Sequence, residues 1–180
     1  EKYANDFSIR YKVNCRAEYI DALDYPTHRK FVEDVLAKTP QLDNVLIVFG
    51  YLGTQEKAQA DFNEAHRIID TNFTGVVSVC ELLAAEFESR KKGNIAVISS
   101  VAGDRGRQSN YMYGSAKGGL SVYLSGLRNR LSKSGVNVLT VKPGFVNTPM
   151  TYGMPLPKPL VASPEKVGKD IYKAMKSGKS

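Results

Sequence analysis

Three short apolar runs, each too short for a helix, constrain the fold more than any other feature of the chain. They are VLIVF (45–49), IAVI (95–98) and VNVLTV (136–141), and they are rich in β-branched residues. A weaker fourth run, RAEYIDA (16–22), precedes them. Long helical patterns lie between the runs. Strands that alternate with helices predict an α/β fold, in which helices cover a parallel sheet.

Two long stretches repeat apolar residues at the spacing of a helix. In 62–90 and in 112–133 such residues recur every three or four positions. They are Ile69, Phe73, Val76, Cys80, Leu83 and Phe87 in the first stretch, and Leu120, Leu124, Leu127 and Leu131 in the second. Because positions at this spacing share one face of a helix, we expect two helices that each pack one face on the sheet.

The chain shows neither a linker nor an internal repeat, so we interpret residues 1–180 as one domain. This length can bury a sizeable core. The one irregular stretch is TPMTYGMPLPKPLVASP (148–164), whose five prolines exclude a regular helix or strand. We interpret 148–164 as a lid loop over the substrate.

Composition narrows the class of protein. The net charge of +7 comes from scattered lysines and arginines without a nucleic-acid-binding motif, so no nucleic-acid partner is expected. Cys15 and Cys80 stand alone, and His28 and His66 are expected on exposed helix faces, so no metal site is predicted. No run approaches the roughly 18 apolar residues of a membrane span, and no signal-peptide pattern opens the chain. A reducing cytoplasm fits these features best.

Small and polar residues follow each of the three main strands. They are FGYLG (49–53), SSVAG (99–103) and KPGFVNTP (142–149). Glycine and serine end strands in any protein, so one such loop would mean little. In an open parallel sheet, however, ligands bind outside the carboxyl ends of the strands. Three such loops at one edge therefore predict a ligand crevice.

The stretch YMYGSAKGGL (111–120) places a phenol one helical turn before an ammonium. Tyr113 and Lys117 stand at i and i+4 and so share a helix face, whereas Tyr111 pairs with Ser115. A nearby ammonium favours the phenolate and lowers the pKa of the phenol toward working pH. The small residues between them would let a flat cofactor approach the helix. The same spacing also arises by chance on many helices.

Two further residues strengthen this interpretation. Ser100 ends a predicted strand 13 residues before Tyr113, and Asn72 lies within DTNFTG on the long helix before that strand. Together with Tyr113 and Lys117 they resemble the active-site tetrad of the short-chain dehydrogenase/reductase family, and the likeness covers nearly the whole chain. The resemblance implies a Rossmann-like, doubly wound parallel sheet with helices on both faces.

The resemblance also implies which residues bind a nicotinamide dinucleotide. The family's proline-glycine motif matches KPGFVNTP, and its adenine-binding pair after the third strand matches Asp21–Ala22. Its Asn-Ala-Gly motif reads Val48-Phe49-Gly50 here, so only backbone contacts are expected at Val48. The implied cofactor-binding residues are Asp21, Ala22, Val48, Phe49, Gly50, Tyr113, Lys117, Pro143, Gly144, Val146 and Thr148.

The family's glycine-rich phosphate loop is absent from this sequence. The resemblance places that loop before Glu1, and it places the family's last strand after Ser180. We therefore expect a partial Rossmann-type domain that lacks the first two strands and the last strand, with 16–22 at the sheet edge. Without the loop, the pyrophosphate loses its helix N-terminus. We expect the 180-residue chain alone to be inactive.

The implied activity is hydride transfer between NAD(P)H and a carbonyl or secondary alcohol. In reduction, Tyr113 would donate the proton, Ser100 would hold the carbonyl oxygen, and Lys117 would bind the nicotinamide ribose and lower the phenol pKa. Asn72 would hold a water that reprotonates Lys117. The sequence does not distinguish NAD from NADP. A non-catalytic dinucleotide-binding or scaffolding homologue is the alternative.

The family also assembles through the two long helices, so a homodimer or homotetramer is expected. An outward patch for that contact would include Val79, Leu82, Tyr123 and Leu127. The alternative is that these apolar stripes only cover the sheet.

The substrate is the least determined feature. The segment from Ser99 to Leu120 is similar to the decaprenylphosphoryl-2-keto-ribose reductase subgroup, which implies a keto-sugar or lipid-linked carbonyl and leaves open a peripheral membrane contact. Arg105 and Arg107 could face a phosphate. Apolar residues of 148–164 could cover a lipid chain, namely Met150, Met154, Leu156 and Leu160. The simpler interpretation, which we favour, is solvated arginines and a lid over any modest ketone.

Overall fold

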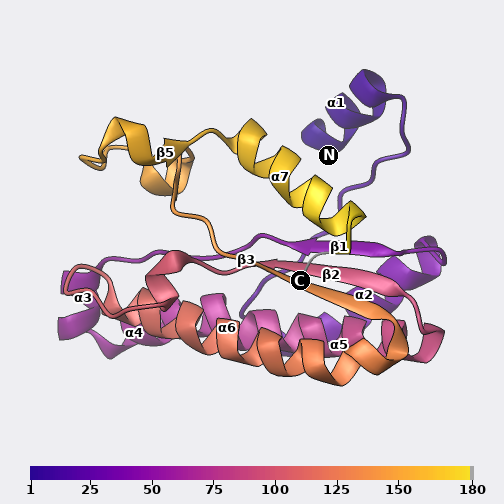
Figure 1. The fold of residues 1–180 in the computed structure, drawn as a ribbon, viewed down its shortest axis with the longest axis horizontal. Helices are drawn as coiled ribbons and strands as arrows, with labels where there is room; N and C mark the ends of the chain where they lie inside the picture. The colour runs from indigo at the N-terminus through magenta and orange to yellow at the C-terminus, as the bar shows by residue number, and fades with distance from the viewer. Residues whose placement is uncertain (179–180) are drawn as a thin grey trace.

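A three-stranded parallel sheet lies at the centre of the protein (Figure 1). The computed structural model describes residues 1–178. The strands are β1 (Asn44–Ile47), β2 (Gly93–Ile98) and β3 (Val136–Val141), in the order β1-β2-β3. The register places Val45 opposite Ile95, and Ile95 opposite Val138. The three main predicted strands are therefore confirmed.

The central position of β2 explains why its residues 95–98 are all apolar. β2 pairs on both edges, and Ile95, Ala96 and Val97 are fully buried. A strand that is covered on both faces has no position for a polar side chain, so it reads as a continuous apolar run.

Most helices lie on one side of the sheet in Figure 1. They are α2 (Tyr25–Lys38), α3 (Gln55–Ala60), α4 (Phe62–Ile69), α5 (Gly75–Arg90) and α6 (Tyr111–Leu131). The core lies between the sheet and the helices α5 and α6, where Phe87, Leu120 and Leu124 are fully buried. The two long predicted helices are confirmed.

A π-helical segment, Asp70–Thr74, joins α4 to α5 into one helix from Phe62 to Arg90. By length and composition this helix could cross a membrane, although the count of consecutive apolar residues predicted no such segment. In this structure its apolar face packs in the core, with Val76, Cys80 and Leu83 buried. The core helix of a soluble protein can have the same length and apolar composition as a membrane-spanning helix.

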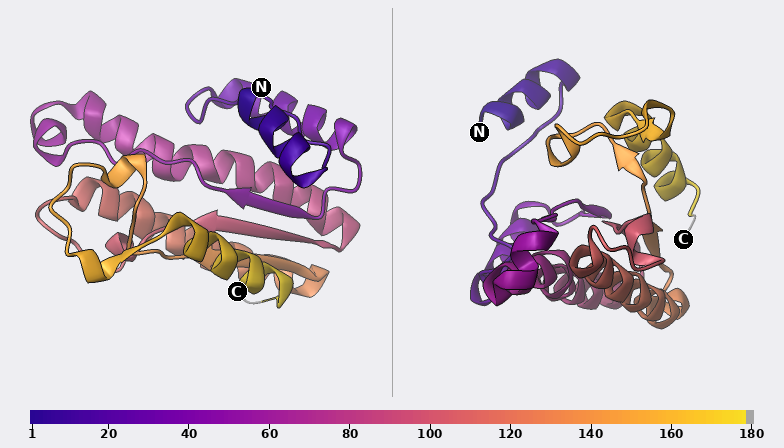
Figure 2. Two further views of the ribbon diagram at one scale, coloured as in Figure 1. Left: turned by 90° about the horizontal axis from the view of Figure 1, so that it is seen from above. Right: turned by 90° about the vertical axis from the view of Figure 1, so that its left-hand side faces the viewer.

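Two helices lie on the opposite side of the sheet. Figure 2 shows α1 (Lys2–Tyr11) and α7 (Pro164–Lys176) across the sheet from α5 and α6. α7 contacts β3 and buries Ile171, whereas α1 buries only Ala4. Helices therefore lie on both faces, but the second face is covered more sparsely.

The predicted strand at 16–22 is wrong. Residues 13–21 have no regular structure, and Tyr19 is 86% exposed. A strand needs a neighbour for its backbone N–H and C=O groups. Residues 16–22 pair with none of the described strands, and β1 pairs only with β2. This segment instead leads into a loop, Asp21–Asp24, that packs against the start of α5.

The proline-rich stretch 148–164 is mostly irregular, as predicted. It contains short 3-10 turns at Pro149–Thr151 and Lys158–Leu160. The exception is β5 (Val161–Ala162), which pairs in parallel with β4 (Phe145–Val146). The two residues of β5 follow Pro159, so both have the backbone N–H that strand pairing requires.

The predicted outward patch is partly wrong. Val79 and Leu127 are only 4% exposed because they pack into the core between the helices and the sheet. Leu82 and Tyr123 are half-buried, and Tyr123 donates a hydrogen bond of 2.8 Å to Glu81. The outer surface of α5 and α6 is therefore more polar than expected.

Candidate active site

Ser100, Tyr113 and Lys117 come together beside the carboxyl end of β2. Ser100 follows that strand and begins a 3-10 turn, Val101–Gly103, whereas Tyr113 and Lys117 lie on α6. The Ser100 side chain lies near enough to the phenol of Tyr113 to act on its pKa, which it lowers. The Nζ of Lys117 lies 5.8 Å from the centroid of the Tyr113 ring. The tertiary structure thus assembles three of the four predicted tetrad residues from two elements.

Backbone contacts hold α6 against the turn that carries Ser100. A Cβ atom at Gly114 would lie 2.8 Å from the carbonyl oxygen of Ala102, and one at Gly118 would lie 2.9 Å from that of Gly103. The small residues were expected to admit a flat cofactor. Gly114 instead admits the neighbouring backbone, and Ala116 is buried. This close approach sets the distance between Ser100 and Tyr113.

Ser99 reinforces the same contact, although the sequence analysis did not single it out. Its side chain is buried and donates a hydrogen bond of 2.9 Å to the carbonyl of Lys117. The Ser99 and Ser121 hydroxyls lie 2.8 Å apart. In the sequence, a serine directly after an apolar strand indicates a functional position. Ser100 is also such a serine, so the sequence did not point to Ser99.

Lys117 is buried, with 2% of its surface exposed. Its Nζ donates a hydrogen bond of 2.9 Å to the carbonyl of Ile98. Burial disfavours the charged ammonium and lowers the pKa of Lys117 to about 8. The group therefore exchanges its proton close to neutral pH.

The pKa of Tyr113 departs from expectation. Burial raises the pKa of Tyr113 above its usual value of 10.0, and the nearby Ser100 side chain lowers it by less. The predicted lowering by Lys117 is therefore wrong for this structure. A buried lysine with a reduced pKa carries less charge, which weakens its effect on a phenol.

Asn72 completes the predicted tetrad from the π-helical segment. Its side chain is fully buried and donates to the carbonyls of Tyr51 and Ile68, while its Oδ1 accepts from the backbone N–H of Tyr51. π-helical turns occur frequently at functional sites. Here the turn aims Asn72 at the loop that follows β1. A Cβ atom at Gly50 would lie 2.8 Å from Asn72 Oδ1 and 3.6 Å from Lys117 Nζ, so this loop adjoins both residues.

Apart from Tyr113 and Lys117 on α6, the predicted cofactor-binding residues lie in three separate segments. Asp21 and Ala22 precede α2, and the carbonyl of Ala22 would lie 2.3 Å from a Cβ atom at Gly75. Val48, Phe49 and Gly50 follow β1, where Val48 is exposed and Phe49 packs on the core.

The third segment follows β3 and approaches the turn after Ser100. The backbone N–H of Val101 donates a hydrogen bond of 3.3 Å to the carbonyl of Pro143. Gly144 is exposed and Val146 lies in β4. The backbone N–H of Thr148 donates to the hydroxyl of Thr151 at 3.2 Å. Pro143 is thus brought beside the site, and the residues after it lead into 148–164.

A buried acid beside the site was missed. The Glu64 side chain is 3% exposed and accepts hydrogen bonds from the Tyr51 hydroxyl at 2.9 Å and the Thr54 N–H at 3.1 Å. Burial acts to raise the pKa of Glu64, but these hydrogen bonds and Lys57 outweigh it, so the pKa is lowered. Glu64 therefore anchors the loop after β1 to α4. Its position four residues before Ile68, which puts both on one helix face, was the available sequence signal.

Gln55 is a second missed residue. It is buried, and its Oε1 accepts a hydrogen bond of 3.0 Å from the backbone N–H of Met112, next to Tyr113. This bond joins residues 57 positions apart and fixes the start of α6. The separation explains why no local pattern indicates it.

The residues proposed for substrate contact are mostly exposed. Arg105 and Arg107 lie on the surface after the Ser100 turn, where Lys142 pairs with Asp104 at 2.6 Å. In 148–164, Met150, Met154 and Leu160 are exposed and Leu156 is half-buried. Within residues 1–178, no cluster of three or more potential metal-ligating side chains was found.

Comparison with known proteins agrees with this geometry. The short chain dehydrogenase profile matches residues 10–156. An uncharacterized oxidoreductase of Mycobacterium tuberculosis is 40% identical over 159 residues, covering 88% of this chain and 64% of the relative. An NADP-dependent 3-hydroxy acid dehydrogenase of Schizosaccharomyces pombe is 25% identical, covering 82% of this chain and 58% of that enzyme. The chain thus spans less than two thirds of the length of these relatives.

Solved structures show the same fold. ElxO with NADP bound superposes with a TM-score of 0.85 at 19% identity, covering 97% of this chain and 76% of that one. A variant of actinorhodin polyketide ketoreductase with NADPH gives a TM-score of 0.85 at 20% identity, with the same coverage of both chains. The predicted Rossmann-like α/β fold is confirmed. By its profile match and its 40% identity to the mycobacterial protein, this chain belongs to the short chain dehydrogenase family.

Proposed function

We propose that the protein is an oxidoreductase that transfers a hydride between a nicotinamide cofactor and a carbonyl or secondary alcohol. The observation that carries this proposal is the group formed by Ser100, Tyr113 and Lys117, in which a hydroxyl lies beside a half-buried phenol and a buried lysine. Catalytic acids need a partner that adjusts their proton affinity, and this group supplies one. The printed name of the mycobacterial relative, an oxidoreductase, supports the same class of reaction.

The residues present fit a nicotinamide dinucleotide. The Lys117 ammonium has three N–H donors, of which the bond to Ile98 uses one, so others can bind ribose hydroxyls. A Cβ atom at Gly144 would meet nothing within 4 Å, which leaves that backbone open. The cofactor would be held by Asp21, Ala22, Val48, Phe49, Gly50, Tyr113, Lys117, Pro143, Gly144, Val146 and Thr148. When bound, NADH or NADPH supplies the hydride.

The side chains of the site would transfer the proton to the substrate. In reduction, the Tyr113 O–H donates a proton to the substrate oxygen as the carbonyl carbon is reduced. Ser100 donates a hydrogen bond that orients that oxygen and stabilises the developing charge. The proton then returns to Tyr113 through Lys117, whose pKa of about 8 suits exchange with solvent. Asn72 orders the loop after β1 and the water near Lys117.

Cofactor oxidation by the full-length natural protein tests this proposal. We expect NADPH or NADH to be oxidised with at least one member of a panel of ketones, and the isolated 180-residue chain to be inactive. Tight cofactor binding without a burst of oxidation for any ketone would favour the alternative, a non-catalytic dinucleotide-binding or scaffolding protein. Robust turnover by the isolated chain would contradict its expected inactivity.

The substrate and assembly are narrower proposals. We propose a small carbonyl substrate covered by the lid loop 148–164. A keto-sugar or lipid-linked carbonyl with a phosphate near Arg105 and Arg107 is the more specific form of this proposal, and such a substrate would bring a peripheral membrane contact.

We also propose a cytoplasmic homodimer or homotetramer that assembles through α5 and α6. Light scattering of the full-length protein at micromolar concentration tests the assembly, and a monomer would contradict it.

A further inference from the structure

His28 is fully buried, although the sequence predicted it on an exposed helix face. It lies in the first turn of α2, and its ring joins two other parts of the chain. The Nε2 atom lies 2.8 Å from the carbonyl oxygen of Asp21, and the Nδ1 atom lies 2.9 Å from the hydroxyl of Ser78 on α5. A carbonyl can only accept, so Nε2 carries the hydrogen. In the neutral ring, Nδ1 then accepts the hydrogen of the Ser78 hydroxyl.

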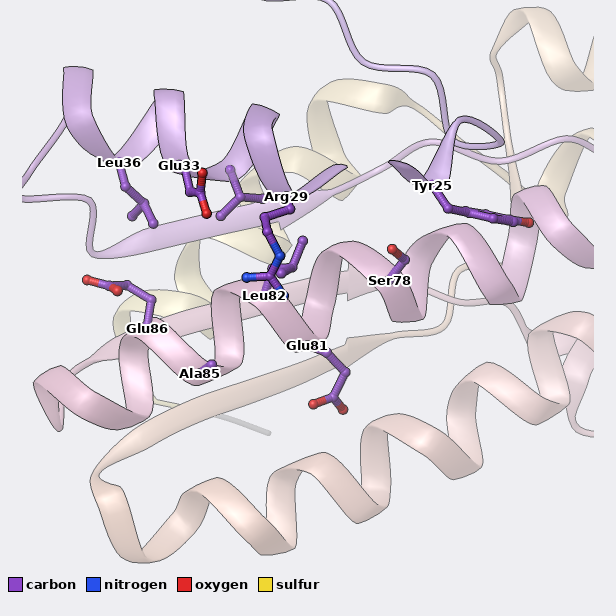
Figure 3. A pocket seen from close by; sticks show the side chains of 10 residues that line it. Tyr25, Arg29, Glu33, Leu36, Ser78, Glu81, Leu82, Ala85 and Glu86 are labelled. Carbon is purple, nitrogen blue, oxygen red and sulfur yellow. The ribbon is translucent and has the colours of Figure 1, made fainter. Parts of the chain in front are cut away.

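These bonds fix the loop Asp21–Asp24 at one point on α5. Within the loop, the carboxylate of Asp21 accepts from the N–H of Leu23 at 2.9 Å, and its carbonyl also accepts from the N–H of Asp24 at 3.2 Å. Ser78 lines the groove between α2 and α5 that Figure 3 shows, with Tyr25 at one end of it. His28 thus connects the loop to the wall of this groove.

Gly75 fixes the same loop at a second point on α5. The carbonyl oxygen of Ala22 would lie 2.3 Å from a Cβ atom at this position, so only glycine allows the loop to lie so close to α5. Gly75 and Ser78 are three residues apart on one helix, which places them on neighbouring turns of the same face. The backbone of Asp21 and Ala22 is therefore held at two points along α5.

The same helical segment also holds the loop after β1. Asn72 binds the backbone of Tyr51, and Asn72 precedes Gly75 by one turn in the continuous helix from Phe62 to Arg90. At 1.5 Å per residue, the two anchor points lie about 4.5 Å apart along the helix axis. Two loops that the proposed function assigns to the dinucleotide are thus aligned on one rigid element.

We propose that His28 is a positioning residue for the adenine end of the dinucleotide site. Through Asp21 and Ser78 it holds the Asp21–Ala22 backbone in the conformation against which adenine lies. This inference rests on the proposed function. A loop ordered before binding loses less conformational entropy when the ligand arrives, so loss of His28 weakens binding of the adenine half and leaves the nicotinamide half unaffected.

The test measures the two halves of the cofactor separately in the full-length natural protein. Isothermal titration gives the Kd of ADP and of adenosine 2′,5′-bisphosphate, and separately that of reduced nicotinamide mononucleotide. We expect His28→Ala to raise the Kd of the better adenine fragment about tenfold, with the mononucleotide Kd within twofold. His28→Gln should recover most of the affinity, because its amide offers one donor and one acceptor. The control is His66→Ala, at the chain's other histidine, which is exposed on α4.

The outcomes separate this inference from the proposed function. If the unsubstituted protein binds neither half, both fail. If it binds both halves and His28→Ala binds them equally well, only the inference fails. An equal loss of both halves would show a general structural role and would also overturn it. Should His28→Ala not fold, Ser78→Ala removes one of the two bonds and should raise the adenine-fragment Kd about threefold; an unchanged Kd would overturn the inference.

Discussion

The Nζ atom of Lys117 lies 2.9 Å from the carbonyl oxygen of Ile98, the last residue of β2, and donates a hydrogen bond to it. This bond ties α6 to the carboxyl end of the central strand. The side chain of Lys117 is buried, with 2% of its surface exposed. Among its described contacts it has no carboxylate partner. The charge of this lysine therefore opposes folding.

Replacing Lys117 by methionine should stabilise the fold most at neutral pH. An unfolded lysine titrates near 10.5, and the folded group titrates near 8. Below pH 8 the buried group is charged and opposes folding. Between pH 8 and 10.5 the folded state releases its proton first, so this cost disappears as pH rises. The difference in unfolding free energy between Lys117→Met and the unsubstituted protein should shrink by about 2 kcal/mol from pH 7 to pH 9.5.

Denaturant unfolding at a series of pH values provides this measurement. Taking the difference between the two proteins cancels the opposing effect of Cys80, whose pKa burial raises to about 12. A difference that stays constant with pH would mean that Lys117 keeps an ordinary pKa in the folded state.

Tyr113→Phe should abolish turnover while retaining the cofactor. Removing the hydroxyl removes the proposed proton donor but leaves the ring and Lys117 in place. A positioned acid contributes roughly 10²–10⁴-fold to rate, so we expect a loss of kcat in that range and a change in NADPH Kd of less than threefold. Tyr111→Phe, at an exposed tyrosine on the same helix, is the matched control and should keep normal turnover. Retained turnover in Tyr113→Phe would refute the proposed role.

Two glycines of α6 should respond oppositely to alanine. At Gly118 a Cβ atom would lie 2.9 Å from the backbone carbonyl of Gly103, so Gly118→Ala must displace the Ser100 turn. We expect a loss of roughly 1–3 kcal/mol in unfolding free energy. At Gly126 nothing lies within 4 Å of a Cβ atom, and alanine there should stabilise the helix by about 0.5–1 kcal/mol. Equal stabilities in thermal or denaturant unfolding would contradict the close packing of α6 on the turn.

Replacing Arg105 and Arg107 together by alanine tests the narrower substrate proposal. If these side chains bind a phosphate, KM for a phosphorylated ketone should rise at least tenfold, while KM for a neutral ketone stays within twofold. Steady-state kinetics with a matched pair of substrates measures both values. Equal effects on the two substrates would leave the arginines as solvated surface residues.

Much of the architecture was predictable because it depends on local patterns. The strands at 45–49, 95–98 and 136–141 and the helices at 62–90 and 112–133 follow from the spacing of apolar residues. The pairing of Tyr113 with Lys117 follows from helix geometry alone. The prediction of a strand at 16–22 was wrong because a strand also requires a neighbouring strand, and a local pattern does not reveal one.

Sequence alone determined the elements, the family resemblance and the residue types of the candidate site. Only the tertiary structure decided their environments: Asn72 binds the backbone of Tyr51, Gly118 packs on Gly103, and His28 is enclosed between Asp21 and Ser78. It also decided that burial lowers the pKa of Lys117 and raises that of Tyr113. The physical reason is that periodicity acts between residues a few positions apart. Burial and hydrogen bonding instead depend on segments that meet only once the chain has folded.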